Sequence, residues 1–251
     1  IGGIVLVSGE VWVHHLFVTG MPDWIRIGQM VTTLLISVPV GLMLIGLVGT
    51  MYKGAIDLSK TPMQYAMGFI FLFLVGGLTG IPNAIPSLDL HISDTYFIVG
   101  HFHYVMAVAG TFAIFAGVYY IFPKMTGRMY NEKIGKIGFW LSFVGTNVAF
   151  WTQMEMGLAG MPRRYYDYAH MPQFESDQMV MTIGSILIGI GFVLALGNWI
   201  HGAIWGEKAP DNPWGSNSLE WTTTTPPPHG NWPEIPTIDP DWHPYNYKGK
   251  S

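Results

Sequence analysis

The sequence contains no cysteine and few charged residues. Asp, Glu, Lys and Arg together make up 11% of its 251 residues. The absence of cysteine excludes disulfides, a thiolate nucleophile, iron–sulfur clusters and cysteine-ligated haem. Soluble domains carry roughly 25% charged residues, so this composition, with 50% hydrophobic residues and a mean hydropathy of +0.33, indicates an integral membrane protein.

A block of basic residues and an N-terminal targeting signal are also missing. The net charge is −4, and no run of Lys or Arg points to nucleic acid as a partner. The chain starts with Ile1, and its first residues are apolar, with neither a basic region nor a small-residue cleavage site. We therefore expect a chain that begins inside a helix, as a fragment or as one half of a split polypeptide.

Six apolar stretches are close to the 20 residues that a membrane-spanning helix needs. They are residues 1–19, 29–52, 64–86, 95–122, 137–158 and 178–205. Because lipid satisfies no backbone hydrogen bonds, an open chain of this pattern must cross as helices. The predicted fold class is therefore all-α, a polytopic membrane bundle of six transmembrane helices in residues 1–208, followed by a tail rich in Pro and Trp at 209–251.

Basic residues favour one side of this predicted bundle. The loops after the second, fourth and sixth stretches carry Lys53, Lys60, Lys124, Arg128, Lys133, Lys136 and Lys208. The opposite loops carry only Arg26, Arg163 and Arg164. The positive-inside rule places the first set, and the tail with it, on the inner side. The tail contains several aromatic residues, which indicate an extended strap over the protein: Trp214, Trp221, Trp232, Trp242 and Tyr245. The alternative is that the end of the tail is disordered.

His101 and His103 lie inside an apolar stretch, where ionisable side chains are costly and typical of functional sites. Positions two apart on a helix point to nearly opposite faces, at about 100° per residue. One metal ion cannot easily take both imidazoles, but two prosthetic groups flanking the helix can. The alternative is that both histidines donate hydrogen bonds to neighbouring helices.

A second pair, His14 and His15, lies near the outer end of the first stretch, at a depth similar to that of His101 and His103. Two neutral imidazoles suit copper or zinc, although a third ligand is normally needed. Adjacent residues reach one ion only where the helix is distorted or the ion lies off its face. The alternative is an interfacial polar pair. Glu10, one turn earlier, either moves protons or pairs with a missing helix.

Two further polar groups lie in the predicted outer loops. Paired guanidiniums at Arg163 and Arg164 can clamp carboxylates, with lipid headgroups as the alternative ligand. Asp89, His91 and Asp94 have ligand types suited to a divalent ion. The alternative is helix capping, because Ser93 and Asp94 are good N-cap residues. For the cluster as a whole capping is the favoured interpretation, and for Asp94 alone both interpretations stay open.

Four ordered motifs resemble one known family. They are Trp12-Val13-His14-His15-Leu16-Phe17, Asp94-Thr95-Tyr96-Phe97 with His101-Phe102-His103-Tyr104, Gly160-Met161-Pro162-Arg163-Arg164-Tyr165, and Asn212-Pro213-Trp214-Gly215 with Leu219-Glu220-Trp221 and 226–229. They resemble the copper-histidine helix, the two-haem helix, the propionate loop and the C-terminal signature of the haem-copper oxidase superfamily. The match is to the C-terminal half of subunit I of the cytochrome c oxidase type.

The resemblance implies half of a twelve-helix core that reduces O₂ to water. His14 and His15 would be two of three copper ligands, and His101 would bind the high-spin haem facing that copper, which makes these three the catalytic residues. His103 would bind the low-spin haem on the other side of the helix. The implied cofactors are two haems, most simply of the a type, and copper. The missing half would supply the third copper ligand.

The same resemblance implies that Arg163 and Arg164 bind haem propionates. Asp94 would join a magnesium site facing subunit II, but the family's His-Asp pair is here Ser93-Asp94, with His91 displaced by two. The implied partners are the N-terminal half of subunit I, subunits II and III, cytochrome c or a similar donor, and membrane lipid. We expect a bacterial or archaeal inner membrane, with the mitochondrial inner membrane as the alternative.

One departure supports a rival function. The family's Pro-Thr-Gly-x-Lys, whose lysine feeds protons to the active site, reads Pro39-Val40-Gly41-Leu42-Met43. Glu10 is also unusual for an oxygen reductase. Nitric oxide reductases of the same superfamily lack the lysine path and place glutamates near the metals, so NO reduction is the first alternative. A non-catalytic membrane subunit is the second.

Overall fold

The computed structural model describes the whole chain except residues 55, 235 and 238–251. Within this described part the secondary structure is helical, with no strands. In chain order the elements are α1 (Gly2–Val11), η1 (Trp12–Leu16), α2 (Asp23–Leu35), α3 (Ser37–Met51), α4 (Thr61–Ala84), α5 (Pro86–Ile92), α6 (Tyr96–Phe102), η2 (His103–Val108), α7 (Ala109–Thr126), α8 (Glu132–Thr146), η3 (Asn147–Trp151), α9 (Thr152–Leu158), η4 (Pro172–Phe174), α10 (Glu175–Trp205) and η5 (Leu219–Trp221).

Four helical segments of the described chain are long and apolar enough to cross a membrane. They are 23–51, 61–84, 96–126 and 172–205. The predicted all-α, polytopic membrane bundle is therefore confirmed. The predicted span 1–19 is a ten-residue α1 followed by a 3₁₀ turn. The predicted span 137–158 belongs to the continuous helical run α8–η3–α9, whose buried polar residues Ser142, Thr146 and Gln153 lower its hydropathy.

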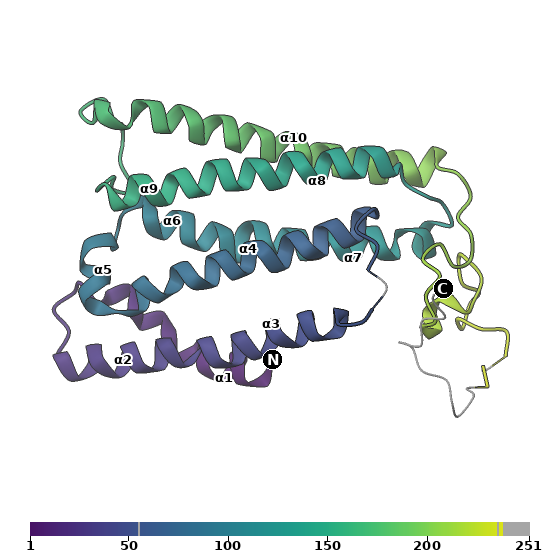
Figure 1. The fold of residues 1–251 in the computed structure, drawn as a ribbon, viewed down its shortest axis with the longest axis horizontal. Coiled ribbons are helices and arrows are strands. Elements are labelled where there is room, and N and C mark those ends of the chain that lie inside the picture. The colour runs from purple at the N-terminus through teal and green to yellow at the C-terminus, as the bar shows by residue number, and fades with distance from the viewer. Residues whose placement is uncertain (55, 235, 238–251) are drawn as a thin grey trace.

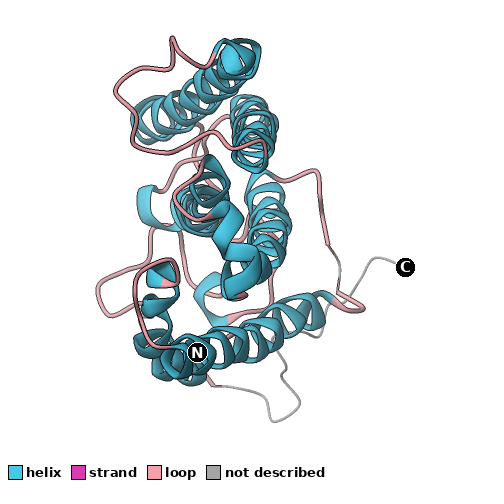
Figure 2. Ribbon diagram, turned by 90° about the vertical axis from the view of Figure 1, so that its left-hand side faces the viewer, coloured by secondary structure: helices cyan, strands magenta, loops and turns pink. Residues whose placement is uncertain are grey.

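The long helices lie side by side, and α1–α3 form a separate layer below α4 (Figure 1). Viewed from the end that carries α5 and α9, the helices stack in the order α10, α8, α4 with α6–α7, and α1–α3 (Figure 2). Aromatic residues fill the space between α4, α7, α8 and α10, with Tyr65, Tyr104, Phe112 and Tyr119 fully buried. By contrast, α1 and α3 contain no buried residue.

Glycines allow α8 and α10 to approach closely. A Cβ added to Gly191 of α10 would lie 2.1 Å from Ser142 Oγ of α8, and one added to Gly184 would lie 2.6 Å from Ala149 N. Small residues at helix interfaces are typical of membrane bundles, where packing rather than the hydrophobic effect drives association. This pair of helices forms the upper wall of the bundle in Figure 1.

Proline explains where the second span breaks. Pro39 has no backbone N–H, and its ring clashes with the carbonyl four residues earlier. That carbonyl belongs to Leu35, where α2 ends, and α3 begins at Ser37. Proline also separates α4 from α5: Ile85, between the end of α4 at Ala84 and the start of α5 at Pro86, is extended, as is usual for a residue before proline.

The described part of the tail packs on the C-terminal end of α7. The indoles of Trp214 and Trp221 donate to Tyr120 O and Tyr120 Oη over 3.0 and 2.6 Å. Lys124 Nζ, almost fully buried, donates to the carbonyls of Asp211, Thr223 and Thr224 over 3.2, 3.0 and 3.3 Å and lies 4.7 Å from the Trp221 ring centre. Segment 209–232 is thus a strap over α7. Trp242 and Tyr245 lie outside the described residues.

Candidate metal and haem centre

The segment that carries His101 and His103 changes its helical geometry between the two residues. His101 lies in the last turn of α6, and His103 begins η2, a π-helical segment that continues into α7. π-Helical turns inside α-helices are rare and frequently mark functional sites. A second π-helical segment, η3, faces the first, and Tyr104 Oη donates to Asn147 Oδ1 across them over 3.0 Å.

His101 packs against α4. Its Nδ1 lies 3.0 Å from Gly76 O and 3.1 Å from Thr79 Oγ1. A carbonyl oxygen only accepts hydrogen bonds, so the Nδ1 next to it carries the proton. The Nε2 of His101 makes no hydrogen bond within the described residues, and its lone pair is available to a metal ion. This is the tautomer that metal-binding histidines commonly adopt.

His103 packs on the opposite side, against η3. Its Nδ1 donates to Val99 O over 2.7 Å, and its ring stacks on Phe102 and Phe150 with centres 4.6 and 4.4 Å away. Its Nε2 likewise has no partner in the described part of the chain. The expected arrangement on opposite faces is therefore present: the imidazoles of His101 and His103 contact different helices, and each presents Nε2.

His14 and His15 present converging nitrogens. Their Nε2 atoms lie 3.0 Å apart, and the ring centres are 4.1 Å apart. The pair lies in the 3₁₀ turn η1, which supplies the local distortion that two adjacent ligands require. His14 Nδ1 lies 3.3 Å from Thr33 Oγ1 of α2. Two neutral imidazoles with nitrogens this close can share one proton or one soft or borderline metal ion.

The two histidine pairs lie at the same end of the bundle. His101 is within electrostatic range of both His14 and His15, and His15 is within range of Arg163 and Asp94. No three His, Asp or Glu side chains in the described residues converge on one metal position. A copper ion at His14 and His15 would therefore need its third ligand from another polypeptide segment, as the resemblance implies.

Arg163 is fixed by the segment that precedes α6. Its Nε and Nη2 donate to Asp94 Oδ1 over 2.7 and 2.5 Å, and its backbone N–H donates to Asp94 O over 2.9 Å. An isolated antiparallel bridge joins Thr95 to Pro162 beside this pair. Arg164 is exposed, at a φ of 63°, and its guanidinium has no partner in the described residues. One arginine is paired, and its neighbour is free.

The prediction that Ser93 or Asp94 is the N-cap of the helix is wrong; Ser93 is instead the C-cap of α5. Thr95 is the N-cap of α6, and its Oγ1 accepts a hydrogen bond from Phe97 N over 3.2 Å. Asp94 adopts a φ of 58° and pairs with Arg163 instead. Asp89 is 2% exposed, and burial raises the pKa of its carboxyl to about 6. Asp89 and Asp94 do not converge with His91 on one ion position.

Sequence reasoning missed the residues that position the histidines. Gly76 and Thr79 of α4 hold His101, and Phe150 of η3 stacks on His103. The Gly76-Gly77 pair inside an apolar helix is a weak signal of close backbone approach. A Cβ on Gly76 would lie 2.7 Å from Val105 Cγ2, so this glycine lets η2 approach α4.

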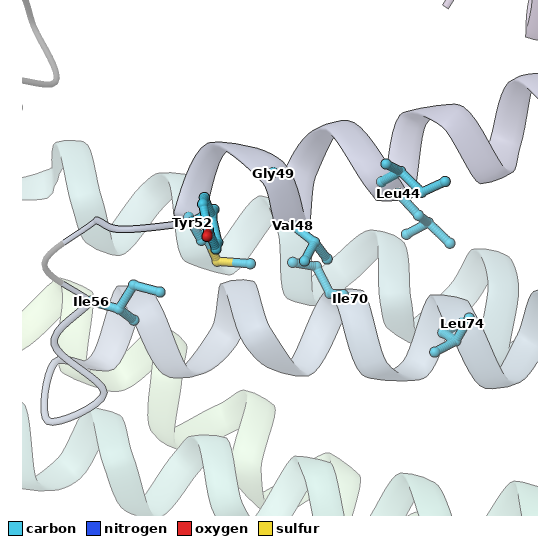
Figure 3. A pocket seen from close by; sticks show the side chains of 9 residues that line it. Leu44, Val48, Gly49, Tyr52, Ile56, Ile70 and Leu74 are labelled. Carbon is cyan, nitrogen blue, oxygen red and sulfur yellow. The ribbon is translucent and has the colours of Figure 1, made fainter.

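A separate groove of about 620 Å³ runs between α3 and α4 (Figure 3), and none of the four histidines lines it. Its walls are apolar apart from the hydroxyl of Tyr52, and the side chains of Leu44, Val48, Ile70 and Leu74 face it. Among the described residues that line it there is no Asp, Glu, His, Lys or Arg, so the groove lacks a charged group or an imidazole for catalysis. The candidate site is the histidine end of the bundle.

The four imidazoles fit a haem and copper centre. Nδ1 of His101 and of His103 is satisfied by a protein acceptor, which leaves Nε2 on opposite sides of one span for two haem irons. The converging Nε2 atoms of His14 and His15 suit copper. Glycines at positions 76, 80 and 100 let the neighbouring helices approach the histidine-bearing segment.

Comparisons with known proteins agree with this fit. The family described as cytochrome c and quinol oxidase polypeptide I matches residues 1–221. A probable cytochrome c oxidase subunit 1-beta from Nocardia farcinica is 46% identical over 237 residues, which cover 94% of this chain and 40% of that protein. Cytochrome c oxidase subunit 1 from Corynebacterium diphtheriae is 47% identical over 235 residues, covering 93% and 41%.

A solved structure supports the fold. A haem-copper terminal oxidase dimer matches with a TM-score of 0.67 at 20% identity, over 80% of this chain and 40% of that one. The chain thus spans about 40% of the length of the curated relatives it matches. Together with the matched 221 residues, these relatives confirm the resemblance: the chain belongs to the cytochrome c and quinol oxidase polypeptide I family, the subunit I family of haem-copper oxidases.

Proposed function

We propose that this chain is part of the catalytic subunit of a respiratory oxidase that reduces O₂ to water with electrons from cytochrome c or a similar donor, coupled to proton uptake. One observation carries the proposal: the His101 and His103 rings contact different neighbouring segments, each with Nδ1 bonded to protein and with no partner for Nε2 among the described residues. The relatives, named as cytochrome c oxidase subunits, support O₂ as the substrate.

Each histidine has a proposed role. His101 would hold the high-spin haem, His103 the low-spin haem, and His14 and His15 the copper facing the first haem. The haems and copper supply electron transfer and O₂ binding when they are present. The protein supplies orientation: Val99 O fixes the His103 ring over 2.7 Å, and Thr33 lies beside Nδ1 of His14 at 3.3 Å.

The arginine loop has a proposed electrostatic role. Within the described part of the chain Arg164 has no partner and Arg163 uses only Nε and Nη2 on Asp94, so guanidinium donors remain for haem propionates. Asp94 fixes Arg163 at the start of α6 and would also be a ligand of a magnesium ion at the interface with subunit II. The two arginines then balance the negative charge of the propionates at the outer end of the bundle.

The rest of the assembly follows from the proposed function. The remaining part of subunit I would supply the third copper ligand and the other ligand of the low-spin haem, and subunits II and III would complete the complex. The four apolar helices make the chain an integral membrane protein. Relatives from Nocardia and Corynebacterium support a bacterial inner membrane.

Purification of the complex from its native membrane tests the proposal. We expect two haem signals, one high-spin and one low-spin, one copper of the active-site type, and steady O₂ consumption with reduced cytochrome c or a similar donor. The position of the haem absorption bands identifies the haem type. A complex without haem and copper would overturn the proposal and favour a non-catalytic membrane subunit.

NO reduction is the rival reaction, because Val40 and Met43 replace polar residues of the lysine path with apolar ones. The groove beside α3 is also lined by apolar side chains. Turnover of NO with no O₂ consumption by the same preparation would decide for the rival. The co-purifying part of subunit I gives a second measurement: a histidine followed one turn later by tyrosine supports O₂ reduction, and glutamates in place of that tyrosine support NO reduction.

A further inference from the structure

One face of α4 forms a seat for the His101 imidazole. Gly76, Thr79 and Gly80 share this face, because positions i, i+3 and i+4 lie together on a helix. A Cβ on Gly80 would lie 3.0 Å from His101 Cε1, so the ring lies directly against the α4 backbone. Thr79 is the one residue of the three with a side chain, and its hydroxyl is at the edge of the ring.

Three polar atoms form a triangle at this seat. Thr79 Oγ1 donates to Gly76 O over 2.8 Å, and His101 Nδ1 lies 3.0 Å from Gly76 O and 3.1 Å from Thr79 Oγ1. Because Gly76 O only accepts, Nδ1 is the donor, and the single hydroxyl hydrogen of Thr79 is used on Gly76. Thr79 Oγ1 is therefore the second acceptor of the Nδ1–H.

We propose that Thr79 is a positioning residue for the haem ligand: its hydroxyl, with Gly76 O, fixes the Nδ1 proton and the ring plane of His101, so that Nε2 faces the high-spin haem iron. The proposal rests on the proposed function, in which His101 is that ligand. Hydrogen bonds to the far nitrogen of a metal-bound imidazole set its tautomer and orientation and raise its basicity.

Removing the hydroxyl should weaken the iron–histidine bond without abolishing it. Thr79→Val keeps a β-branched side chain of similar size but leaves Gly76 O as the sole acceptor at Nδ1. Less electron density then reaches Nε2, and the ring is free to tilt. Thr79→Ser keeps the hydroxyl and should restore the bond.

Resonance Raman spectroscopy of the reduced complex measures this bond directly through the iron–histidine stretching band of the high-spin haem. We expect the band to shift to lower frequency in Thr79→Val and to return toward the wild-type position in Thr79→Ser. Thr111→Val is a matched control: Thr111 Oγ1 also donates to a carbonyl of the preceding helical turn, Ala107 O, over 2.6 Å, and it has no hydrogen bond to a histidine among the described residues. The low-spin haem at His103 is the internal reference and should not change.

Each outcome decides the proposal. An unshifted band in Thr79→Val, or an equal shift in Thr111→Val, overturns it, and so does loss of both haems in Thr79→Val. Loss of the high-spin haem alone in Thr79→Val, with both haems kept in Thr79→Ser, supports it. A wild-type complex without the band, or His101→Ala with the band intact, contradicts the proposed function itself, and the two failures are thereby distinguished.

Discussion

The two histidine pairs belong to regions that are packed very differently. Within the described chain, 33% of the apolar window of 96–126, which carries His101 and His103, is buried, against 6% for 23–51, next to which His14 and His15 lie. His101, His103 and His14 are half-buried and each contacts another helical segment, whereas His15 is exposed. The described part of this chain therefore fixes the rings of His101 and His103, the pair proposed to bind the haems. His14 and His15, the pair proposed to bind copper, lie beside a largely unburied helix, which in our proposal the rest of subunit I covers.

Replacing one histidine at a time should have the largest effect and should distinguish the two histidine pairs. We expect His101→Ala to remove the high-spin haem and abolish turnover while leaving the low-spin signal, because His103 is held by Val99 and Phe150 independently of α4. His14→Ala should remove copper and turnover but leave both haem signals. Optical spectra and metal analysis of the purified complex check both variants. Simultaneous loss of both haems in His101→Ala would contradict the separate assignments.

A charge placed in the loosely packed region tests what covers it. Met43→Lys introduces an ammonium into α3, and at the centre of a membrane helix this costs about 2.5–3.5 kcal/mol. If the surroundings of α3 are dry in the complex, assembly and thermal stability should fall by that amount, with Met43→Leu as the neutral control. Unchanged assembly and melting temperature would show that a hydrated path survives there without the family's lysine.

A glycine in the packed region should be intolerant of even one added carbon. The Cβ of Gly157→Ala would lie 1.9 Å from Phe97 N, and that obstacle is backbone. Separating α9 from α6 should cost about 1–3 kcal/mol and broaden the His103 haem signal, since Phe150 lies on the same helical run. Thermal unfolding followed at the haem band measures the loss. Gly189→Ala has open space around its Cβ and is the matched control; equal losses in both would contradict the packing argument.

Sequence periodicity and hydropathy predicted much of the fold, because membrane spans are defined by composition and length. The placement of His101 and His103 on opposite faces also follows from helical spacing. The π-helical segments η2 and η3 do not, because a change in hydrogen-bond register leaves no mark on the apolar pattern. The pairs Gly76 with His101 and Asp94 with Arg163 depend on how helices pack across 25 and 69 residues, which spacing alone does not give.

A substitution in the tail strap should have the smallest effect, because the hydrogen bonds of Lys124 to segment 209–232 are local. Lys124→Met removes three hydrogen bonds to Asp211, Thr223 and Thr224, each worth about 1.5–3 kcal/mol, but also the desolvation cost of a buried ammonium. We therefore expect under about 2 kcal/mol of global stability to be lost, and faster hydrogen exchange confined to residues 209–232. Lys133→Met, at an exposed position that follows the same loop, is the control. If hydrogen exchange in the strap is unchanged while the haem bands shift, the strap end of α7 is coupled to the histidine end of the bundle. The effect of Lys124 is then not local, which would contradict this prediction.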